Sequence, residues 1–244
     1  IETWLATKLP KRADPGVVAV EKPEGNGMSS ETLLFTARWT IEERPIERGF
    51  VARIEPEPGN VPVFPTYDLR LQYDAMALVG DATDAPVPEV LWYEPDGGVI
   101  GAPFFVMGRA DGLVPPDLMP YTFPDDNFLM VASPESRGRL QRAAVRALAA
   151  VHEISPEQHD LRFLELDTPG DTALERHLAH WEGYKQWVTG DEPSRLLDDC
   201  FAWLREHLPV EGTDTGEARL SWGDARIGNM MFVDFEVSAV LDWE

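Results

Sequence analysis

The chain contains a single cysteine, Cys200, among its 244 residues. One thiol excludes an internal disulfide framework and a metal site built from several cysteines. The spacing of Cys200, Phe201 and Leu204 places all three on one face of a helix. We therefore expect this cysteine to lie in the core.

Long hydrophobic runs are also missing. No uninterrupted apolar stretch reaches the length of a transmembrane helix, and the first residues do not form a signal peptide. We therefore expect a cytoplasmic protein without a membrane partner. The chain does not begin with methionine, which indicates that residues precede Ile1 in the complete protein.

Basic residues are scarce. The 21 lysines and arginines stand against 43 aspartates and glutamates, which gives a net charge of -22. Such a charge repels phosphate backbones and argues against nucleic acid and anionic membranes as partners. It would attract a cationic small molecule, although an acidic surface that only serves solubility explains the same balance.

The first hundred residues are predicted to form mainly strands and the later residues mainly helices. β-branched or apolar segments between Gly/Pro turns predict strands over 17–20, 32–39, 49–54, 89–93 and 103–107. Apolar residues at helical spacing predict helices over 67–79, 135–154, 172–188 and 194–208. A Gly/Pro-containing linker over 108–117 then predicts an α+β fold of two lobes, residues 1–107 and 108–244, with a cleft at the linker.

The last two dozen residues carry three polar side chains around a predicted hairpin. Asp224 lies in a turn before the first strand, Asn229 follows five positions later, and Asp242 ends the second strand. A carboxylate in a turn can accept a proton from an attacking alcohol, and Asn and Asp oxygens can bind Mg²⁺. These residue types in this order indicate phosphoryl transfer from ATP. Taken one at a time, each is better explained as a residue that caps or bends the backbone.

Longer motifs around these residues resemble those of one known family. WGDARIGNMMF…AVLDWE resembles the H-G-D-x4-N…D-[WF]-E signature of the aminoglycoside phosphotransferase/choline kinase-like (APH) family. The similarity is greatest to bacterial members related to the kinase domains of certain acyl-CoA dehydrogenase fusions. The upstream segments GMSSETLLFTARW, VPVFPTYDLRLQYD, DAPVPEVLWYE, GAPFFVMGRADG and RALAAVHEI fall in the family's order and spacing. The resemblance therefore covers nearly the whole chain.

The resemblance implies a bilobal protein-kinase-like fold. A β-rich N-terminal lobe would bind the nucleotide, and a mainly helical C-terminal lobe would carry catalysis. ATP and Mg²⁺ would be the cofactors, Asp224 the catalytic base, and Asn229 and Asp242 the metal ligands. In the family further helices follow the D-W-E motif, so we expect the C-terminal lobe to be incomplete at Glu244.

The family's nucleotide contacts correspond to three segments of the N-terminal lobe. The resemblance implies a phosphate-covering loop, a cation for the α- and β-phosphates, and a strand whose backbone hydrogen-bonds adenine. These are, in order, Gly27, Met28, Ser29 and Ser30; Arg53; and Phe105, Val106 and Met107. Glycine permits close backbone approach, and serine hydroxyls can hold phosphate oxygens. Without the family context, the three segments are an ordinary hairpin tip, an edge charge and a buried strand.

Three positions depart from the family's pattern. Trp222 replaces the His of H-G-D, Arg53 stands where a Lys is usual, and Gln72 stands where a Glu often pairs with that cation. Arginine keeps the charge but presents a planar fork. Glutamine can hydrogen-bond Arg53 but cannot neutralise it.

The combined prediction is an ATP- and Mg²⁺-dependent transfer of the γ-phosphate to a hydroxyl of a small molecule, such as an aminoglycoside or another amino-alcohol or sugar. Because of these departures from the family's pattern, a second interpretation stays open: a non-catalytic nucleotide-binding protein with the same fold. A metal-dependent phosphohydrolase has no motif in its favour beyond the same Asp and Asn residues. His177 and His180 lie three apart on a predicted helix, but no third metal ligand at suitable spacing accompanies them.

Overall fold

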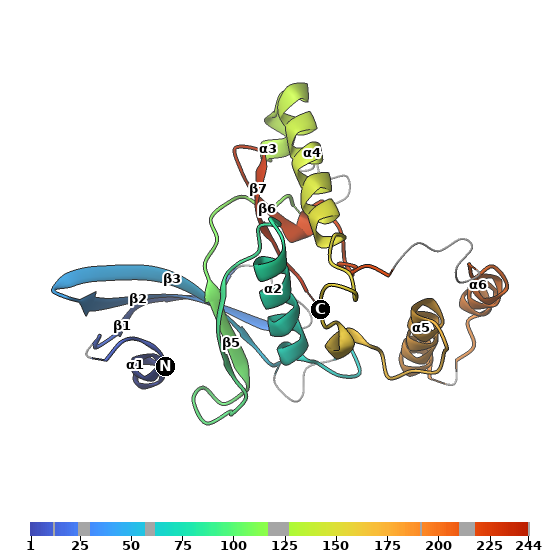
Figure 1. The fold of residues 1–244 in the computed structure, drawn as a ribbon, viewed down its shortest axis with the longest axis horizontal. Coiled ribbons are helices and arrows are strands. Elements are labelled where there is room, and N and C mark those ends of the chain that lie inside the picture. The colour runs from blue at the N-terminus through green and yellow to red at the C-terminus, as the bar shows by residue number, and fades with distance from the viewer. Residues whose placement is uncertain are drawn as a thin grey trace. The chain divides into compact units, whose positions relative to one another are not determined.

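The computed structural model describes residues 1–11, 13–23, 30–56, 62–116, 127–190, 192–209 and 218–243 (Figure 1). The chain divides into two compact units. The first contains Ile1–Val61, Tyr67–Ile154 and Ser221–Glu244, and the second contains Pro62–Thr66 and Ser155–Leu220. The end of the chain therefore belongs to the same unit as its beginning. The lobe boundary at residue 107 stays a prediction.

The sequence contains no apolar run of transmembrane length, and the helices of the described residues can be compared with that observation. None of these helices is both long enough and apolar enough to cross a bilayer.

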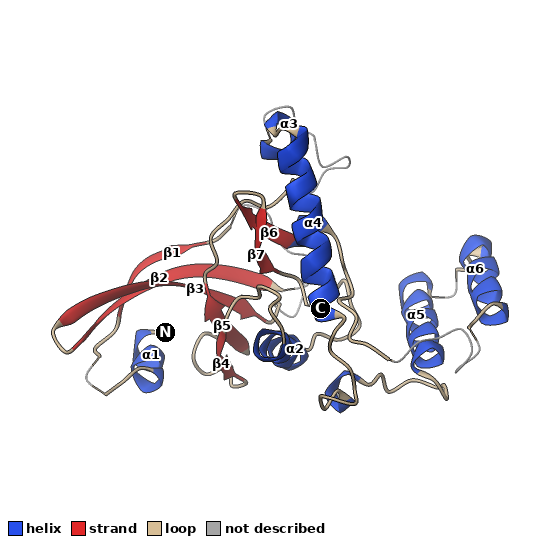
Figure 2. Ribbon diagram, turned by 45° about the horizontal axis from the view of Figure 1, so that its top comes forward, coloured by secondary structure: helices blue, strands red, loops and turns tan. Residues whose placement is uncertain are grey.

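A five-stranded antiparallel sheet forms the N-terminal part of the first unit (Figure 2). Its strands are β1 (Gly16–Glu21), β2 (Glu31–Ile41), β3 (Arg44–Ile54), β4 (Val90–Glu94) and β5 (Phe104–Gly108). They are arranged in the order β1-β2-β3-β5-β4, so the five strands predicted from the sequence are confirmed. β5 is an inner strand, with β3 on one side and β4 on the other.

The turn between β2 and β3 is a feature that the sequence did not predict. Glu42 and Glu43 form it with φ values of 49° and 65°, and regular pairing then continues from Ile41↔Arg44 along both strands. Two-residue hairpin turns with positive φ at both positions favour Asn and Gly, so two glutamates carry no turn signal. β3 consequently begins well before its predicted start at Gly49.

Aromatic side chains form the core between the sheet and α1 (Glu2–Lys8), a helix that was not predicted. The rings of Phe35 and Phe50 stack with centroids 5.2 Å apart, and the ring of Trp4 meets that of Phe104 at 4.9 Å. Burial of side chains of this size is worth roughly 1.5–3 kcal/mol each. Aromatic packing therefore accounts for the attachment of α1 to the sheet.

Glu94, at the end of β4, also joins α1 to the sheet. Its carboxylate accepts a 2.7 Å hydrogen bond from Trp4 Nε1 and lies 3.6 Å from Lys8 Nζ. The indole hydrogen bond is the main reason that the pKa of the Glu94 carboxyl is lowered from its ordinary value. The charged form of Glu94 is thus favoured by folding.

A lowered pKa in the folded state makes this contact pH-dependent. It stabilises the fold above the ordinary glutamate pKa, and the contribution is lost as the pH falls through the lowered value. We expect Glu94→Gln to lower the thermal unfolding midpoint at about pH 7 more than the control Glu157→Gln, which changes an exposed glutamate. The difference between the variants should disappear at about pH 2, where both carboxyls are protonated. An equal difference at both pH values would contradict this role.

Helix α2 (Leu69–Ala82) packs against β4 and β5. The Asp68 carboxylate caps its first turn by accepting a 2.9 Å hydrogen bond from the Leu71 amide. The ring of Tyr73 meets that of Phe105 on β5 at 6.0 Å. The buried residues of α2 are Leu69, Gln72, Ala75, Met76 and Val79. Gln72 is therefore a buried polar side chain on a helix that covers the sheet.

The remaining α-helices and strands of the first unit are α3 (Phe128–Val131), α4 (Pro134–Val151) and the hairpin of β6 (Met230–Val233) and β7 (Glu236–Val240). Helix α4 packs on β7. Leu113, in the segment after β5, exchanges two backbone hydrogen bonds of 2.9 Å with Phe232, and the Val240 amide donates to the Pro86 carbonyl at 2.7 Å. The hairpin is thereby attached to the two segments that flank β4 and β5.

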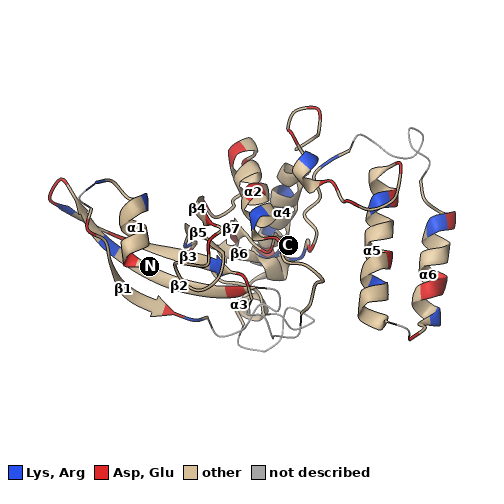
Figure 3. Ribbon diagram, turned by 90° about the horizontal axis from the view of Figure 1, so that it is seen from below, with Lys and Arg blue, Asp and Glu red and all other residues tan. Residues whose placement is uncertain are grey.

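The second unit is helical. It contains the short 3₁₀ helix η1 (Arg162–Leu164), α5 (Ala173–Thr189) and α6 (Arg195–Glu206). A capping box between Thr172 and Glu175 starts α5. Figure 3 shows charged residues along both helices, and the ion pairs Arg205–Glu182 and Lys185–Asp198 join them.

Cys200 corrects a prediction from the sequence. It lies on α6 as expected, but it is exposed, so its placement in the core was wrong. No residue of α6 is buried within the described structure. Helical spacing correctly predicted the helix, but spacing alone does not determine what covers an apolar face.

Candidate active site

The loop that leads into the C-terminal hairpin brings two of the predicted site residues together. Asp224 lies in a turn after Trp222, and the 3₁₀ helix η2 (Ile227–Asn229) then leads directly into β6. The Arg226 amide donates a 2.8 Å hydrogen bond to the Asp224 carbonyl, and the Asn229 amide donates a 3.0 Å bond to the Arg226 carbonyl. The loop therefore folds back so that Asn229 reaches Asp224.

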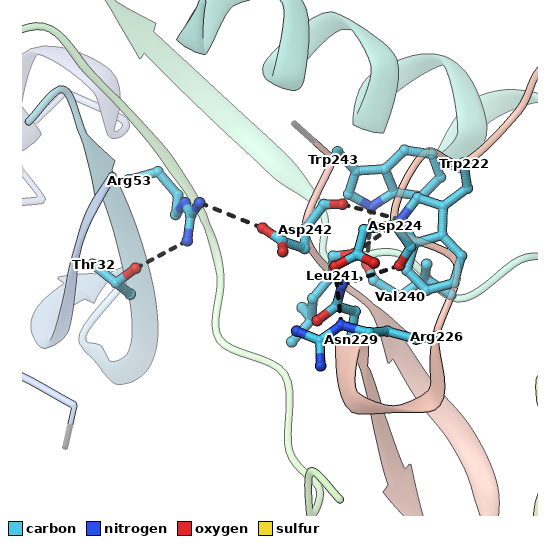
Figure 4. A network of polar contacts seen from close by, with 10 residues as sticks. All are labelled: Thr32, Arg53, Trp222, Asp224, Arg226, Asn229, Val240, Leu241, Asp242 and Trp243. Atoms are coloured by element: carbon cyan, nitrogen blue, oxygen red, sulfur yellow. Dashed lines mark hydrogen bonds and ion pairs between the residues drawn. The ribbon is translucent and has the colours of Figure 1, made fainter. Parts of the chain in front are cut away.

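The Asp224 carboxylate is held by two neighbours (Figure 4). Its Oδ2 atom accepts hydrogen bonds from Asn229 Nδ2 at 2.7 Å and from Arg226 Nε at 2.9 Å. Asn229 Nδ2 also donates to the Asp224 carbonyl at 3.1 Å. The side chain of Asp224 is 59% exposed, whereas Asn229 is only 6% exposed. A buried amide thus orients an accessible carboxylate, and the second oxygen, Oδ1, carries neither of these side-chain bonds.

Asp242 lies just beyond β7 in a left-handed backbone conformation, with φ of 61°. Few non-glycine residues adopt this conformation, although Asp and Asn do so more often than others. Two sets of contacts hold the chain here. The neighbouring Leu241 amide donates to the Asn229 carbonyl at 2.8 Å, and Trp222 Nε1 donates to the Leu241 and Asp242 carbonyls at 3.1 Å each. Asp242 is therefore tied to the Asp224 loop.

Arg53 approaches Asp242 from the sheet. It lies on β3 opposite Thr32 of β2 and Phe105 of β5, and its side chain is only 16% exposed. Its Nη1 donates a 3.1 Å hydrogen bond to Thr32 Oγ1, and its Nη2 lies 3.9 Å from Asp242 Oδ1 (Figure 4). A cation from the N-terminal sheet and an anion from the C-terminal hairpin thus face each other.

Phe105, Val106 and Met107 lie on β5 and are buried. Each is paired with β3 on one side and β4 on the other, as Val106 is with Ala52 and Trp92. A strand paired along both edges has its backbone donors and acceptors engaged in the sheet. New backbone contacts are therefore easier to make where the chain leaves the sheet, just after Gly108.

The predicted phosphate loop is described only at its end. Gly27, Met28 and Ser29 lie outside the described residues. Ser30 is 5% exposed, and its Oγ atom has no hydrogen-bond partner among the described residues. It directly precedes Glu31, which pairs with Ile54 beside Arg53. A buried hydroxyl without a partner is unfavourable, so Ser30 marks a position where a ligand oxygen could bind.

The sequence did not single out Arg226 or Thr32. Arg226 lies between Asp224 and Asn229 in the sequence, and a cation at that position could have indicated its ion pair with Asp224. No comparable signal exists for Thr32, because its contact with Arg53 depends on the register of β2 against β3. Among the described residues, no group of three or more His, Cys, Asp or Glu side chains is placed to hold a metal ion.

The chain is similar in sequence to several longer proteins, among them the following two. "Probable acyl-CoA dehydrogenase IBR3" of Arabidopsis thaliana is 27% identical over 229 residues, which cover 90% of this chain and 25% of that protein. "Acyl-CoA dehydrogenase family member 11" of Gallus gallus is 34% identical over 164 residues, which cover 65% of this chain and 18% of that protein. The chain thus spans a quarter or less of the length of these relatives.

Two crystal structures show the same architecture. A "putative aminoglycoside phosphotransferase" from Ralstonia eutropha is 26% identical, with a TM-score of 0.67 over 99% of this chain and 63% of that one. A thermostable mutant of aminoglycoside phosphotransferase APH(4)-Ia, in a ternary complex with AMP-PNP and hygromycin B, gives a TM-score of 0.53 at 16% identity. That match covers 100% of this chain and 70% of the other, and it shows the fold alone.

These similarities define the molecule as a protein with the α+β, kinase-like fold of the aminoglycoside phosphotransferases, which confirms the predicted fold class. A model of the phosphotransferase enzyme family (APH) matches residues 38–244, a range that contains all residues of Figure 4 except Thr32. The chain belongs to this family, as its motifs predicted.

Proposed function

We propose that this protein transfers the γ-phosphate of ATP to a hydroxyl group of a small molecule, with Mg²⁺ as the metal ion. The observation that supports this most strongly is the bonded group of Asp224, Asn229 and Asp242, which faces Arg53 of the sheet. Phosphoryl transfer requires a group that orients the attacking oxygen, oxygen ligands for the metal and a cation for the phosphates. These four side chains would supply all three kinds: Asp224 would orient the oxygen, Asn229 and Asp242 would bind the metal ion, and Arg53 would be the cation.

Asp224 would be the catalytic base. The acceptor oxygen forms its bond to the γ-phosphorus while the bond to the bridging oxygen of ADP breaks, and the carboxylate takes the hydroxyl proton. Exposure suits this role because a substrate can reach the side chain. The bonds from Asn229 and Arg226 to Oδ2 fix the carboxylate, so Oδ1 is the oxygen that would meet the acceptor.

The donor set fits Mg²⁺. Asn229 Nδ2 is committed to Asp224, so a metal ion would meet this amide through its oxygen, and Asp242 adds a carboxylate. Magnesium prefers oxygen ligands and is commonly held by one or two carboxylates together with substrate phosphates, so a cluster of three acidic residues is not required. When bound, Mg²⁺ would neutralise charge that develops on the phosphate oxygens.

Arg53 and Ser30 would contact the phosphates. The guanidinium offers several donors in a fixed plane, and the Ser30 hydroxyl, which has no partner among the described residues, offers one more. Gln72 cannot neutralise Arg53, but Asp242 lies 3.9 Å from it and supplies a negative charge. The departure at Gln72 is therefore compatible with a charged Arg53 in the site.

For adenine, we propose backbone contacts where the chain leaves β5. Phe105, Val106 and Met107 would supply the buried wall beside the ring, since their backbone groups are paired with β3 and β4. The segment that follows, Gly108 to Asp111, would supply donors and acceptors. Its course is fixed by hydrogen bonds from the Arg109 amide to the Gly49 carbonyl and from Ser238 Oγ to the Asp111 carbonyl.

The acceptor would be a small molecule with a free hydroxyl. The net charge of -22 favours a cationic one, so aminoglycosides, other amino-alcohols and sugars form the first classes to test. Hygromycin B in the APH(4)-Ia complex supports the first of these classes only by analogy of fold.

A non-catalytic nucleotide-binding protein is the second candidate, motivated by Trp222 in place of histidine. The buried Trp222 donates hydrogen bonds to the carbonyls of Leu241 and Asp242, so the site keeps a hydrogen-bond donor at this position. Binding of ATP without turnover of any hydroxyl acceptor would favour this candidate over the proposed transferase.

Nucleotide binding can be tested by calorimetric titration of AMP-PNP in the presence of Mg²⁺. We expect Arg53→Met to weaken binding by about 10- to 100-fold, because hydrogen bonds to a charged group contribute about 1.5–3 kcal/mol each. Arg48→Met is the matched control, since Arg48 lies on the same strand but pairs with Glu89 at the surface. Absence of binding to the wild-type protein would refute the proposed function. Equal affinities of the two variants would refute the role of Arg53.

A further inference from the structure

Trp222 is a buried residue that contacts both halves of the candidate site. Only 2% of its surface is exposed, and its indole ring lies 6.0 Å from that of Trp243, centroid to centroid. Its Nε1 donates to two carbonyl oxygens, those of Leu241 and Asp242, at 3.1 Å each. It is also the second residue before Asp224. The side chain thus links the loop of Asp224 to the segment that carries Asp242.

The two hydrogen bonds of the indole depend on the backbone conformation of Asp242. Consecutive carbonyls of an extended strand point in opposite directions, so one N–H group cannot reach both. They converge on Trp222 because the chain turns at Asp242, where φ is 61°. The same turn directs the Asp242 carboxylate toward Arg53 (Figure 4).

The contact also extends to Asn229. The Leu241 amide donates to the Asn229 carbonyl at 2.8 Å, while the Leu241 carbonyl accepts from Trp222. Asn229 in turn holds the Asp224 carboxylate. The peptide groups on both sides of Leu241 are therefore hydrogen-bonded, one to Asn229 and the other to Trp222.

We propose that Trp222 is a positioning residue whose indole N–H holds Asp242 in the conformation that presents its carboxylate to a metal ion. This inference rests on the proposed function only for the identity of the metal. The hydrogen-bonded link itself is a property of the protein without ligands. The departure from histidine at position 222 would thus replace one N–H donor by another.

Two substitutions separate the donor from the bulk of the ring. Trp222→Phe and Trp222→His both replace the indole by a smaller ring, but only histidine can donate a ring N–H. Trp39→Phe is a matched control, because Trp39 is also buried and its Nε1 has no hydrogen-bond partner among the described residues. Comparison of these variants isolates the effect of the lost N–H.

The first readout is amide hydrogen exchange of residues 237–243 in the protein without metal or nucleotide. Trp222→Phe removes both hydrogen bonds of the indole, which share one N–H donor, so exchange of this segment should become about 3- to 10-fold faster. It should be restored toward the wild-type rate in Trp222→His and unchanged in Trp39→Phe. Helix α2 serves as the internal reference for global stability, because the control residue Trp39 itself lies on β2.

The second readout is the Mg²⁺ concentration that supports half-maximal binding of AMP-PNP. Loss of a group that orients a metal ligand weakens metal binding by about 10- to 100-fold, so this concentration should rise in Trp222→Phe and recover in Trp222→His. If the wild-type protein binds no AMP-PNP, the proposed function fails, while hydrogen exchange still decides the role of Trp222. Equal exchange rates in the Phe and His variants, or loss of the whole fold in both, would overturn the positioning role.

Discussion

Asp224→Asn is expected to lower kcat by about 10²- to 10⁴-fold, the usual contribution of a general base, with little change in the KM for ATP. Asparagine has nearly the same shape, and its amide oxygen can still accept the hydrogen bond from Asn229 Nδ2. It cannot take a proton from the acceptor hydroxyl. Steady-state kinetics with ATP and any acceptor that the wild-type protein phosphorylates would measure the effect.

Asp96→Asn is the control for this prediction. Asp96 also lies in an exposed turn, where its Oδ1 accepts a 2.9 Å hydrogen bond from the Gly98 amide. If Asp224 only shapes the backbone of its turn, the two substitutions should behave alike. An Asp224→Asn variant with the kcat of the wild-type protein would contradict the proposed base.

Asp242→Asn is expected to raise the Mg²⁺ requirement and to lower kcat/KM on the order of 10²- to 10⁴-fold, since a metal ion contributes several kcal/mol to transition-state stabilisation. Asparagine adopts the left-handed conformation of Asp242 readily, so the backbone should keep its course. The substitution removes the proposed charged ligand and the negative charge that faces Arg53. Titration of activity with Mg²⁺ at saturating ATP would separate weaker metal binding from slower transfer.

A second aspartate provides the control. Asp234 lies in the turn between β6 and β7, is exposed, and has φ of 50°. Asp234→Asn makes the same chemical change in the same backbone conformation but away from Arg53. An unchanged Mg²⁺ requirement in Asp242→Asn, or an equal change in both variants, would contradict the role of Asp242 as a metal ligand.

Helices and strands with strong periodicity could be predicted from the sequence. The turns that connect them, and the question of which faces become buried, could not. The strands of the sheet and the longer helices follow from alternating or helical spacing of apolar residues. The β2–β3 turn was missed because Glu42 and Glu43 adopt positive φ without the usual turn residues. Cys200 was misplaced because amphipathic spacing predicts an apolar face but not its partner.

In the site, too, contacts between residues close in the sequence could be anticipated, whereas contacts between distant segments could not. Asp224 and Asn229 are five residues apart in a turn, so their contact could be anticipated from the sequence. The approach of Arg53 to Asp242 could not, because it depends on how the sheet and the hairpin are held together through Leu113 and Phe232. Family resemblance assigned Arg53 to the nucleotide phosphates, but it did not anticipate the approach to Asp242 or the hydrogen bonds of Trp222.

The most direct test of the proposed function follows the γ-phosphate itself. Wild-type protein would be incubated with Mg²⁺, ATP labelled with heavy oxygen in its γ-phosphate, and a panel of amino-alcohols, aminoglycosides, sugars and hydroxyacyl compounds. We expect mass spectrometry to detect one class of acceptor carrying the labelled phosphoryl group, and we expect this product to be lost with Asp224→Asn. Formation of labelled inorganic phosphate alone, or intact ATP with every acceptor, would contradict a hydroxyl-directed phosphotransferase.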